Sequence, residues 1–128
     1  CRYPSMKSQI ITYRDLIVWK KSMDLVIAVY ELTEQFPKTE TYGLMSQMRR
    51  AAVSIPSNIA EGRRRGSRKD FRNFILTAFG SGSELETQVE IAKQLSLGNE
   101  LGYKRVDELL DETMRMLNRM AHSLQATS

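Results

Sequence analysis

The residues best suited to chemistry are arginines and lysines gathered in one stretch of the chain. Residues 49–72 hold eight basic side chains against Glu61 and Asp70, a net charge of +6, whereas the whole chain carries +4. Guanidinium groups bind phosphates bidentately, and a helix that starts within this stretch adds backbone N–H donors. The sequence therefore predicts a nucleic-acid-binding surface. Its predicted residues are Arg49, Arg50, Arg63, Arg64, Arg65, Arg68, Lys69 and Arg72.

The same charges allow other interpretations. The basic run could be a solvated turn that only keeps the protein soluble. Residues 84–112 carry eight acids against three bases, a net charge of −5, so opposite poles could also orient head-to-tail assembly of identical subunits. The run 63–69 contains no aromatic residue, so base stacking on single strands is not predicted.

Residue types for catalysis or metal binding are sparse. His122 is the only histidine, and Arg119 stands where a Glu-x-x-His metal motif needs a carboxylate. No Cys-x-x-Cys spacing and no phosphate-binding glycine loop occur. Glu84, Glu86 and Glu90 fit a solvated or interface face. We predict no enzyme activity, no metal, no cofactor and no small-molecule substrate.

Helices must position these residues, because β-type alternation is absent and only three prolines and seven glycines interrupt the chain. The expected helices cover residues 13–36, 44–65, 67–97 and 99–124. Short connections make consecutive helices antiparallel neighbours. The predicted fold class is all-α, an antiparallel up-down-up-down four-helix bundle with a proline-kinked second helix.

Local signals define the expected helix ends. Pro37 ends the first helix, Gly66 caps the second, Ser67 with Asp70 caps the third, and Asn99 caps the fourth. Inside the second helix, Pro56 is expected to kink the helix or to split it near Ser54.

Residues 80–83, Gly-Ser-Gly-Ser, interrupt the third helical segment. They could form a loop between two shorter helices. We favour a continuous helix in which Gly82 lets another helix approach closely.

The first helix carries two apolar seams about 110° apart, wider than one bundle core needs. One seam contains Leu16, Trp19, Met23, Val26 and Tyr30. The other is assigned to an oligomer interface and contains Val18, Leu25, Val29, Leu32 and Phe36. The alternative is a central helix that touches two neighbours within one bundle.

The second helix carries an unusual polar stripe. Its amides and fork-shaped donors suit a structural role, holding the helix in register or lining a ring, although a solvated face would look similar. The stripe consists of Gln47, Arg50, Ser54, Asn58 and Glu61.

One domain is expected over residues 13–125. Residues 1–12 are expected to be a disordered or non-native tail, with Met6 as a candidate natural start, and residues 126–128 a second tail. A single cysteine, Cys1, precludes an intrachain disulfide and favours the cytoplasm. No apolar run is long enough for a membrane span, so no membrane association is predicted.

Several motifs resemble a known bacterial family. They are Leu16-x-Val18-Trp19-Lys20, Phe36-Pro37, Tyr42-Gly43-Leu44, the run QMRRAAVSIPSNIAEG over residues 47–62, and Gly80-Ser81-x-x-Glu84-Leu85-Glu86-Thr87-Gln88. The chain resembles the four-helix-bundle proteins encoded in intervening sequences of bacterial large-subunit rRNA genes, sometimes labelled ribosomal protein. The resemblance implies a ring-shaped homopentamer without catalytic activity.

A distant relative implied by the resemblance is the accessory variability protein of diversity-generating retroelements, a basic pentamer that binds a reverse transcriptase and its template RNA. Two functions follow as expectations. The first is a homo-oligomer that binds RNA through the basic residues where the second helix turns into the third. The alternative is a protein-interaction scaffold, such as an accessory subunit of a retroelement reverse transcriptase.

Overall fold

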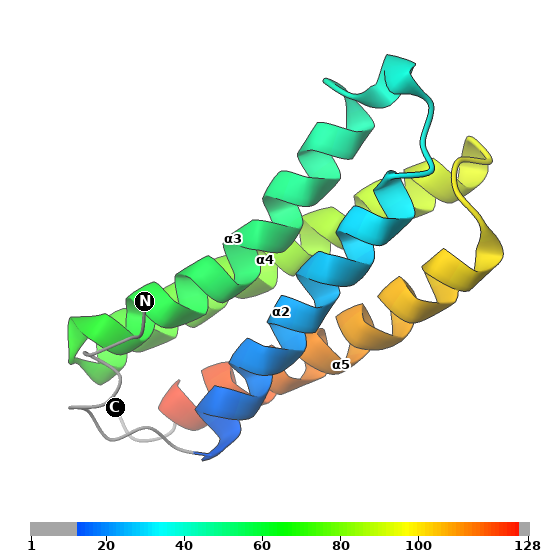
Figure 1. Cartoon of the computed structure of the whole chain (residues 1–128). Helices are drawn as coiled ribbons and strands as arrows, with labels where there is room; N and C mark the ends of the chain where they lie inside the picture. Colours follow the sequence, from blue (N-terminus) through cyan, green and yellow to red (C-terminus); the bar gives the residue numbers. More distant parts are fainter. Residues whose placement is uncertain (1–12, 126–128) are drawn as a thin grey trace.

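Four long helices run side by side in the computed structural model, which describes residues 13–125 (Figure 1). They are α2 (Tyr13–Thr33), α3 (Leu44–Arg65), α4 (Arg68–Gln94) and α5 (Glu100–Gln125), and the short 3-10 helix η1 (Lys38–Glu40) precedes α3. Both α2 and α4 pack against α3 and α5, whereas the backbones of the diagonal pairs, α2 with α4 and α3 with α5, lie farther apart. The predicted all-α, up-down-up-down bundle is confirmed; the predicted tails, 1–12 and 126–128, lie outside the described residues.

The expected caps are present. The Ser67 hydroxyl accepts a hydrogen bond from the Asp70 amide at 3.0 Å, and Asn99 Oδ1 accepts one from the Gly102 amide at 2.8 Å. Gly66 ends α3 in the left-handed region at φ 85°, where a side chain would be strained. These contacts complete polar groups that a helix end leaves unpaired.

The first helix is shorter than expected and ends at Thr33. The Phe36 amide bonds the Thr33 carbonyl at 3.0 Å, which tightens the chain into a turn before Pro37. A residue that precedes proline is pushed out of the helical region, so the helix ends upstream of Phe36. Helix α4 also ends earlier than expected, at Gln94 and not at residue 97, because Ser96 takes a left-handed φ of 58° and the Leu97 amide turns back to the Ala92 carbonyl at 3.0 Å.

The Gly-Ser-Gly-Ser stretch lies within the unbroken helix α4, as we favoured. Gly82 is buried against α5, and a Cβ atom there would lie 2.2 Å from the Met114 sulfur. Gly80, two residues earlier, is exposed with nothing within 4 Å of such an atom. The absent side chain at Gly82 therefore lets α4 and α5 approach closely.

Helix α3 continues without a break through the buried Pro56, so the expected split near Ser54 is wrong. Proline removes the N–H that would bond the carbonyl four residues earlier. Two side chains of the next turn bond neighbouring carbonyls: Ser57 Oγ donates to Val53 O and Asn58 Nδ2 to Ser54 O, both at 2.8 Å. Neither bond reaches the Ala52 carbonyl, four residues before the proline, and the helix is held by the buried core side chains on either side of Pro56, such as Ile55 and Ile59; the kink itself stays a prediction.

The seam assigned to an oligomer interface is instead the core face of α2. Its residues Val18, Leu25, Val29, Leu32 and Phe36 are 0–5% exposed in the single chain. They belong to the core together with buried residues of the other helices, including Ile55, Ile59, Ile75, Leu85 and Leu117. The interface assignment was wrong because both seams repeat at helical spacing, and spacing alone does not say which one faces the bundle.

The exposed apolar side chains of α2 belong mainly to the other seam. Leu16, Met23 and Tyr30 are 37–41% exposed, and Ile27 beside them is 56% exposed. Trp19 and Val26 are partly buried and pack against the core. We call Leu16, Met23, Ile27 and Tyr30 the α2 stripe.

Candidate nucleic-acid interface

Four exposed cations gather where α3 ends and α4 begins. Arg64 and Arg65 occupy the last turn of α3, and Arg68 and Lys69 the first turn of α4, with only Gly66 and Ser67 between them. We call these four cations the basic corner. Two of them, Arg64 and Lys69, make no hydrogen bond or ion pair with another residue of the described range 13–125. They are therefore available to an anionic partner.

The other two cations of the basic corner have partners but remain at the surface. Arg65 Nε lies 3.0 Å from Glu61 Oε2, and its guanidinium lies 5.0 Å from the centre of the Phe74 ring. Arg68 Nη2 donates to the Ser123 carbonyl at 3.3 Å. Exposed pairs of this kind are weak, so both guanidiniums can also meet a phosphate.

Arg72 has a structural role one turn further along α4. It is half-buried, its Nε donates to the Ala121 carbonyl at 2.9 Å, and its Nη2 donates to Gln125 Oε1 at 3.2 Å. A cation beside the last carbonyls of α5 also interacts favourably with the negative end of that helix. Arg72 therefore fastens the end of α5 to α4.

Arg63 points away from the surface that the sequence assigned to it. Its Nη1 lies 3.3 Å from Asp15 Oδ2, with the two side chains 11% and 8% exposed, and its guanidinium lies 5.2 Å from the Phe71 ring centre. This buried ion pair joins the end of α3 to the first turn of α2. It leaves the Arg63 charge neutralised within the fold.

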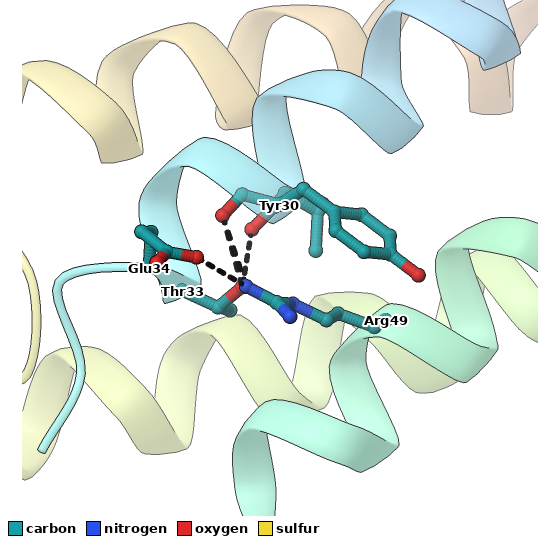
Figure 2. Close-up of polar contacts among 5 residues, drawn as sticks. Tyr30, Thr33, Glu34 and Arg49 are labelled. Atoms are coloured by element: carbon teal, nitrogen blue, oxygen red, sulfur yellow. Dashed lines mark hydrogen bonds and ion pairs between the residues drawn. The ribbon is translucent and has the colours of Figure 1, made fainter. Parts of the chain in front are cut away.

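Arg49 is held at the far end of α3 by the last turn of α2 (Figure 2). Its Nε donates to Thr33 Oγ1 at 2.8 Å, and its Nη2 donates to the Tyr30 carbonyl and to Glu34 Oε1 at 3.3 and 3.2 Å. The same guanidinium lies 4.3 Å from the centre of the Tyr30 ring. Two of the three guanidinium nitrogens are engaged here, so Arg49 also serves the fold.

Arg50 is exposed and has no partner among the described side chains, but it is remote from the basic corner. It lies 14 residues before Arg64 on one continuous helix, which at 1.5 Å per residue is about 21 Å. The structure thus brings Arg64, Arg65, Arg68 and Lys69 together and places Arg50 far from them. The other three predicted cations make contacts between helices: Arg49, Arg63 and Arg72.

The start of α4 is a weaker phosphate-binding site than its sequence suggested, because its N–H donors and its positive end are partly satisfied within the protein. The Ser67 hydroxyl already takes the Asp70 amide, and the Asp70 carboxylate sits in the first helical turn. A negative side chain there offsets the positive end of the helix. The side chains of the basic corner therefore carry the attraction for anions.

The polar stripe of α3 divides into two parts. Ser54 Oγ lies 2.8 Å from Ser81 Oγ of α4, and Asn58 Nδ2 lies 2.9 Å from Ser54 Oγ, so these three side chains bridge α3 and α4. Gln47 and Arg50 are exposed, and Glu61 pairs with Arg65. The centre of the stripe therefore lies between α3 and α4, whereas its ends face solvent; the structural role of the stripe stays a prediction.

The acidic residues lie on a different face. Glu86, Glu90, Asp107 and Asp111 line a shallow groove of about 130 Å³ between α4 and α5, and Lys93 Nζ lies 2.8 Å from Asp107 Oδ2 within it. Across residues 13–125, the structure contains no cluster of three or more metal-ligating side chains. None of the helices in that range is long and apolar enough to cross a membrane.

The fold and its charged end define the chain as an antiparallel four-helix-bundle protein with cations concentrated at the α3–α4 turn. The chain belongs to the 23S rRNA-intervening sequence protein family, whose sequence model matches residues 14–119. The family resemblance read from the sequence motifs is thereby confirmed. The relationship to the retroelement accessory protein stays a prediction.

A solved structure with the same fold comes from Bacteroides thetaiotaomicron, a protein with unknown function from the S23 ribosomal protein family. It has a TM-score of 0.77 and 22% sequence identity, and the match covers 85% of this chain and 98% of that one. Among curated proteins, no similar sequence was found.

Proposed function

We propose that this protein is a non-enzymatic homo-oligomer, a pentameric ring, that binds RNA through the basic corner. The observation that carries the proposal is the pair Arg64 and Lys69, which are exposed and uncommitted beside Arg65 and Arg68. The family is named for an intervening sequence of 23S rRNA, and the proposed RNA partner rests on the cations of the basic corner. The protein is proposed to act in the bacterial cytoplasm.

The size of the basic corner limits how tightly one subunit can bind. Each phosphate neutralised adds roughly 0.7 to 0.9 to the slope of log affinity against log salt. Four cations therefore give a slope of at most about −3 to −4 for one chain, typical of weak binding. Repetition of the basic corner around an oligomer would raise the affinity through multivalency.

Self-assembly is proposed to use the α2 stripe. The exposed side chain of Ile27 lies at its centre, and burial of such apolar groups between copies is favourable. The test is the mass in solution by light scattering, with Ile27→Asp as the disrupting variant. Leu101→Asp, at an exposed position in the first turn of α5, is the matched control.

We expect a pentamer for the native chain and for Leu101→Asp, and a smaller species for Ile27→Asp. A monomeric native chain in dilute solution would overturn the oligomer. An unchanged mass for Ile27→Asp would move the interface away from the α2 stripe.

RNA binding is tested by fluorescence anisotropy at several salt concentrations. Arg64→Ala/Lys69→Ala removes two charges from the basic corner, and Lys104→Ala/Arg105→Ala removes two exposed charges from α5 as the matched control. The first pair should reduce the affinity at least tenfold and the salt slope by about two. The control pair should change neither.

Equal losses in both variants would show that only the net charge matters, against a defined site. An untagged protein that elutes with a low 260/280 nm absorbance ratio and ignores RNA would overturn RNA binding. That outcome favours the alternative, a protein-interaction scaffold such as a reverse-transcriptase accessory subunit, and makes pull-down the next experiment.

A further inference from the structure

We infer that the basic corner recognises the phosphate backbone of base-paired RNA and does not bind single strands by base stacking. This inference rests on the proposed RNA binding and names the class of RNA. It depends on where the aromatic side chains lie relative to Arg64 and Lys69.

The aromatic rings next to the basic corner are covered. Proteins that bind single strands place exposed rings along a cationic path, so that successive bases stack on them. Phe71 of α4 is only 7% exposed, and Phe74 is half-buried. A guanidinium lies over each ring, that of Arg63 at 5.2 Å and that of Arg65 at 5.0 Å. A guanidinium therefore occupies one face of each ring, and Phe71 is almost completely covered.

The exposed aromatic side chains of the described residues lie far from the basic corner. Tyr42 is 96% exposed but precedes α3, whose 22 residues put about 33 Å between it and Arg65. Tyr30 is 41% exposed, yet Arg49 lies over its ring at that same far end. Trp19 packs against the core. Among the side chains of residues 15–125, a strand bound at the basic corner would meet cations without a stacking platform.

The shape of the basic corner fits a duplex backbone. Its cations project from two helix ends that are joined by a turn of two residues, so they form a protruding point of charge. Base-paired RNA is recognised mainly through its shape and through contacts to phosphates and 2′-hydroxyls. Long, flexible cationic side chains on a protruding turn can meet such phosphates without unstacking any base.

The experiment compares two RNA probes of equal nucleotide number by fluorescence anisotropy with the native chain. One is a hairpin with a stem of about 16 base pairs, a length known to span a double-stranded-RNA-binding domain. The other is an unstructured oligouridine. We expect the hairpin to bind at least tenfold more tightly, and Arg64→Ala/Lys69→Ala to lose that binding.

Phe74→Leu is the second variant, because it keeps an apolar side chain but removes the ring nearest the basic corner. We expect it to bind both probes as the native chain does. Equal or tighter binding of oligouridine, or a loss of its binding in Phe74→Leu, would overturn the duplex inference and leave RNA binding intact. Failure of both probes to bind in a salt-dependent way would overturn the proposed function itself.

Discussion

Arg63 and Asp15 form an ion pair inside the protein, with 3.3 Å between Nη1 and Oδ2 and side chains 11% and 8% exposed. The pair connects the last turn of α3 to the first turn of α2, which are separated by most of the first half of the chain. Removing one partner of a buried pair leaves the other charge uncompensated in a poorly solvated site.

Asp15→Asn is therefore expected to lower the free energy of unfolding by about 3 kcal/mol, measured by urea denaturation at pH 7. Asp24→Asn, at an exposed position of the same helix, is the control and should change it by less than about 0.5 kcal/mol. The double variant Asp15→Leu/Arg63→Met should recover much of the loss. A loss for Asp15→Asn no larger than that of the control would contradict a structural role for this pair.

The two glycines in the middle of α4 should respond in opposite directions to alanine. Gly82→Ala puts a methyl group where the Met114 sulfur lies, 2.2 Å from the ideal Cβ position, and should destabilise the fold by about 1–2 kcal/mol. Gly80→Ala meets open space and should stabilise α4 by up to about 1 kcal/mol through helix propensity.

Thermal or urea unfolding of the two variants measures the contrast. A double-mutant cycle with Met114→Ala should show favourable coupling with Gly82→Ala, since the smaller side chain leaves room for the methyl group. If Gly82→Ala were as stabilising as Gly80→Ala, the close approach of α4 and α5 would be refuted.

The bridge between α3 and α4 depends on Asn58. Its Nδ2 donates to the Ser54 carbonyl at 2.8 Å and contacts Ser54 Oγ at 2.9 Å, and Ser54 contacts Ser81. Asn58→Ala should cost about 1–2 kcal/mol of stability, because each net hydrogen bond contributes about 1 kcal/mol. Gln47→Ala, at the exposed end of the same stripe, is the control. Were Asn58→Ala to leave both stability and assembly unchanged, the stripe would be a solvated face.

Tyr103 should make stability depend on alkaline pH. Burial raises the pKa of its hydroxyl above 10.0, with a smaller contribution from the charge of Asp107, and the hydroxyl donates to the Leu97 carbonyl. The folded protein keeps this proton at a pH where the unfolded chain loses it. The stabilisation is therefore complete below about pH 10 and is lost as the pH rises through the folded pKa.

Urea unfolding between pH 8 and pH 11 measures this loss. Tyr103→Phe should be less stable than the native chain at pH 8 and show a shallower decline above pH 10. Tyr42→Phe, at a position 96% exposed, should follow the native curve. Parallel curves for Tyr103→Phe and the native chain would contradict the assignment.

Much of the fold follows from local sequence signals. Ser67, Asn99 and Gly66 mark helix ends through contacts within a few residues, and short connections leave consecutive helices antiparallel. The rotation of α2 about its own axis, which decides the seam that faces the core, does not follow from such signals. Val18 and Met23 lie on seams with the same spacing, and only packing against α3 and α5 buries Val18 and leaves Met23 39% exposed.

The sequence by itself determined that positive charge is concentrated around residues 63–69 and that a helix end, a turn and a helix start present it. Only the tertiary structure decided which of those cations are free. The partners that engage Arg63 and Arg68 are 48 and 55 positions away in the chain, at Asp15 and Ser123. No periodicity encodes contacts over such separations, because they exist only once the helices have packed and fixed the rotation of each side chain toward its neighbour.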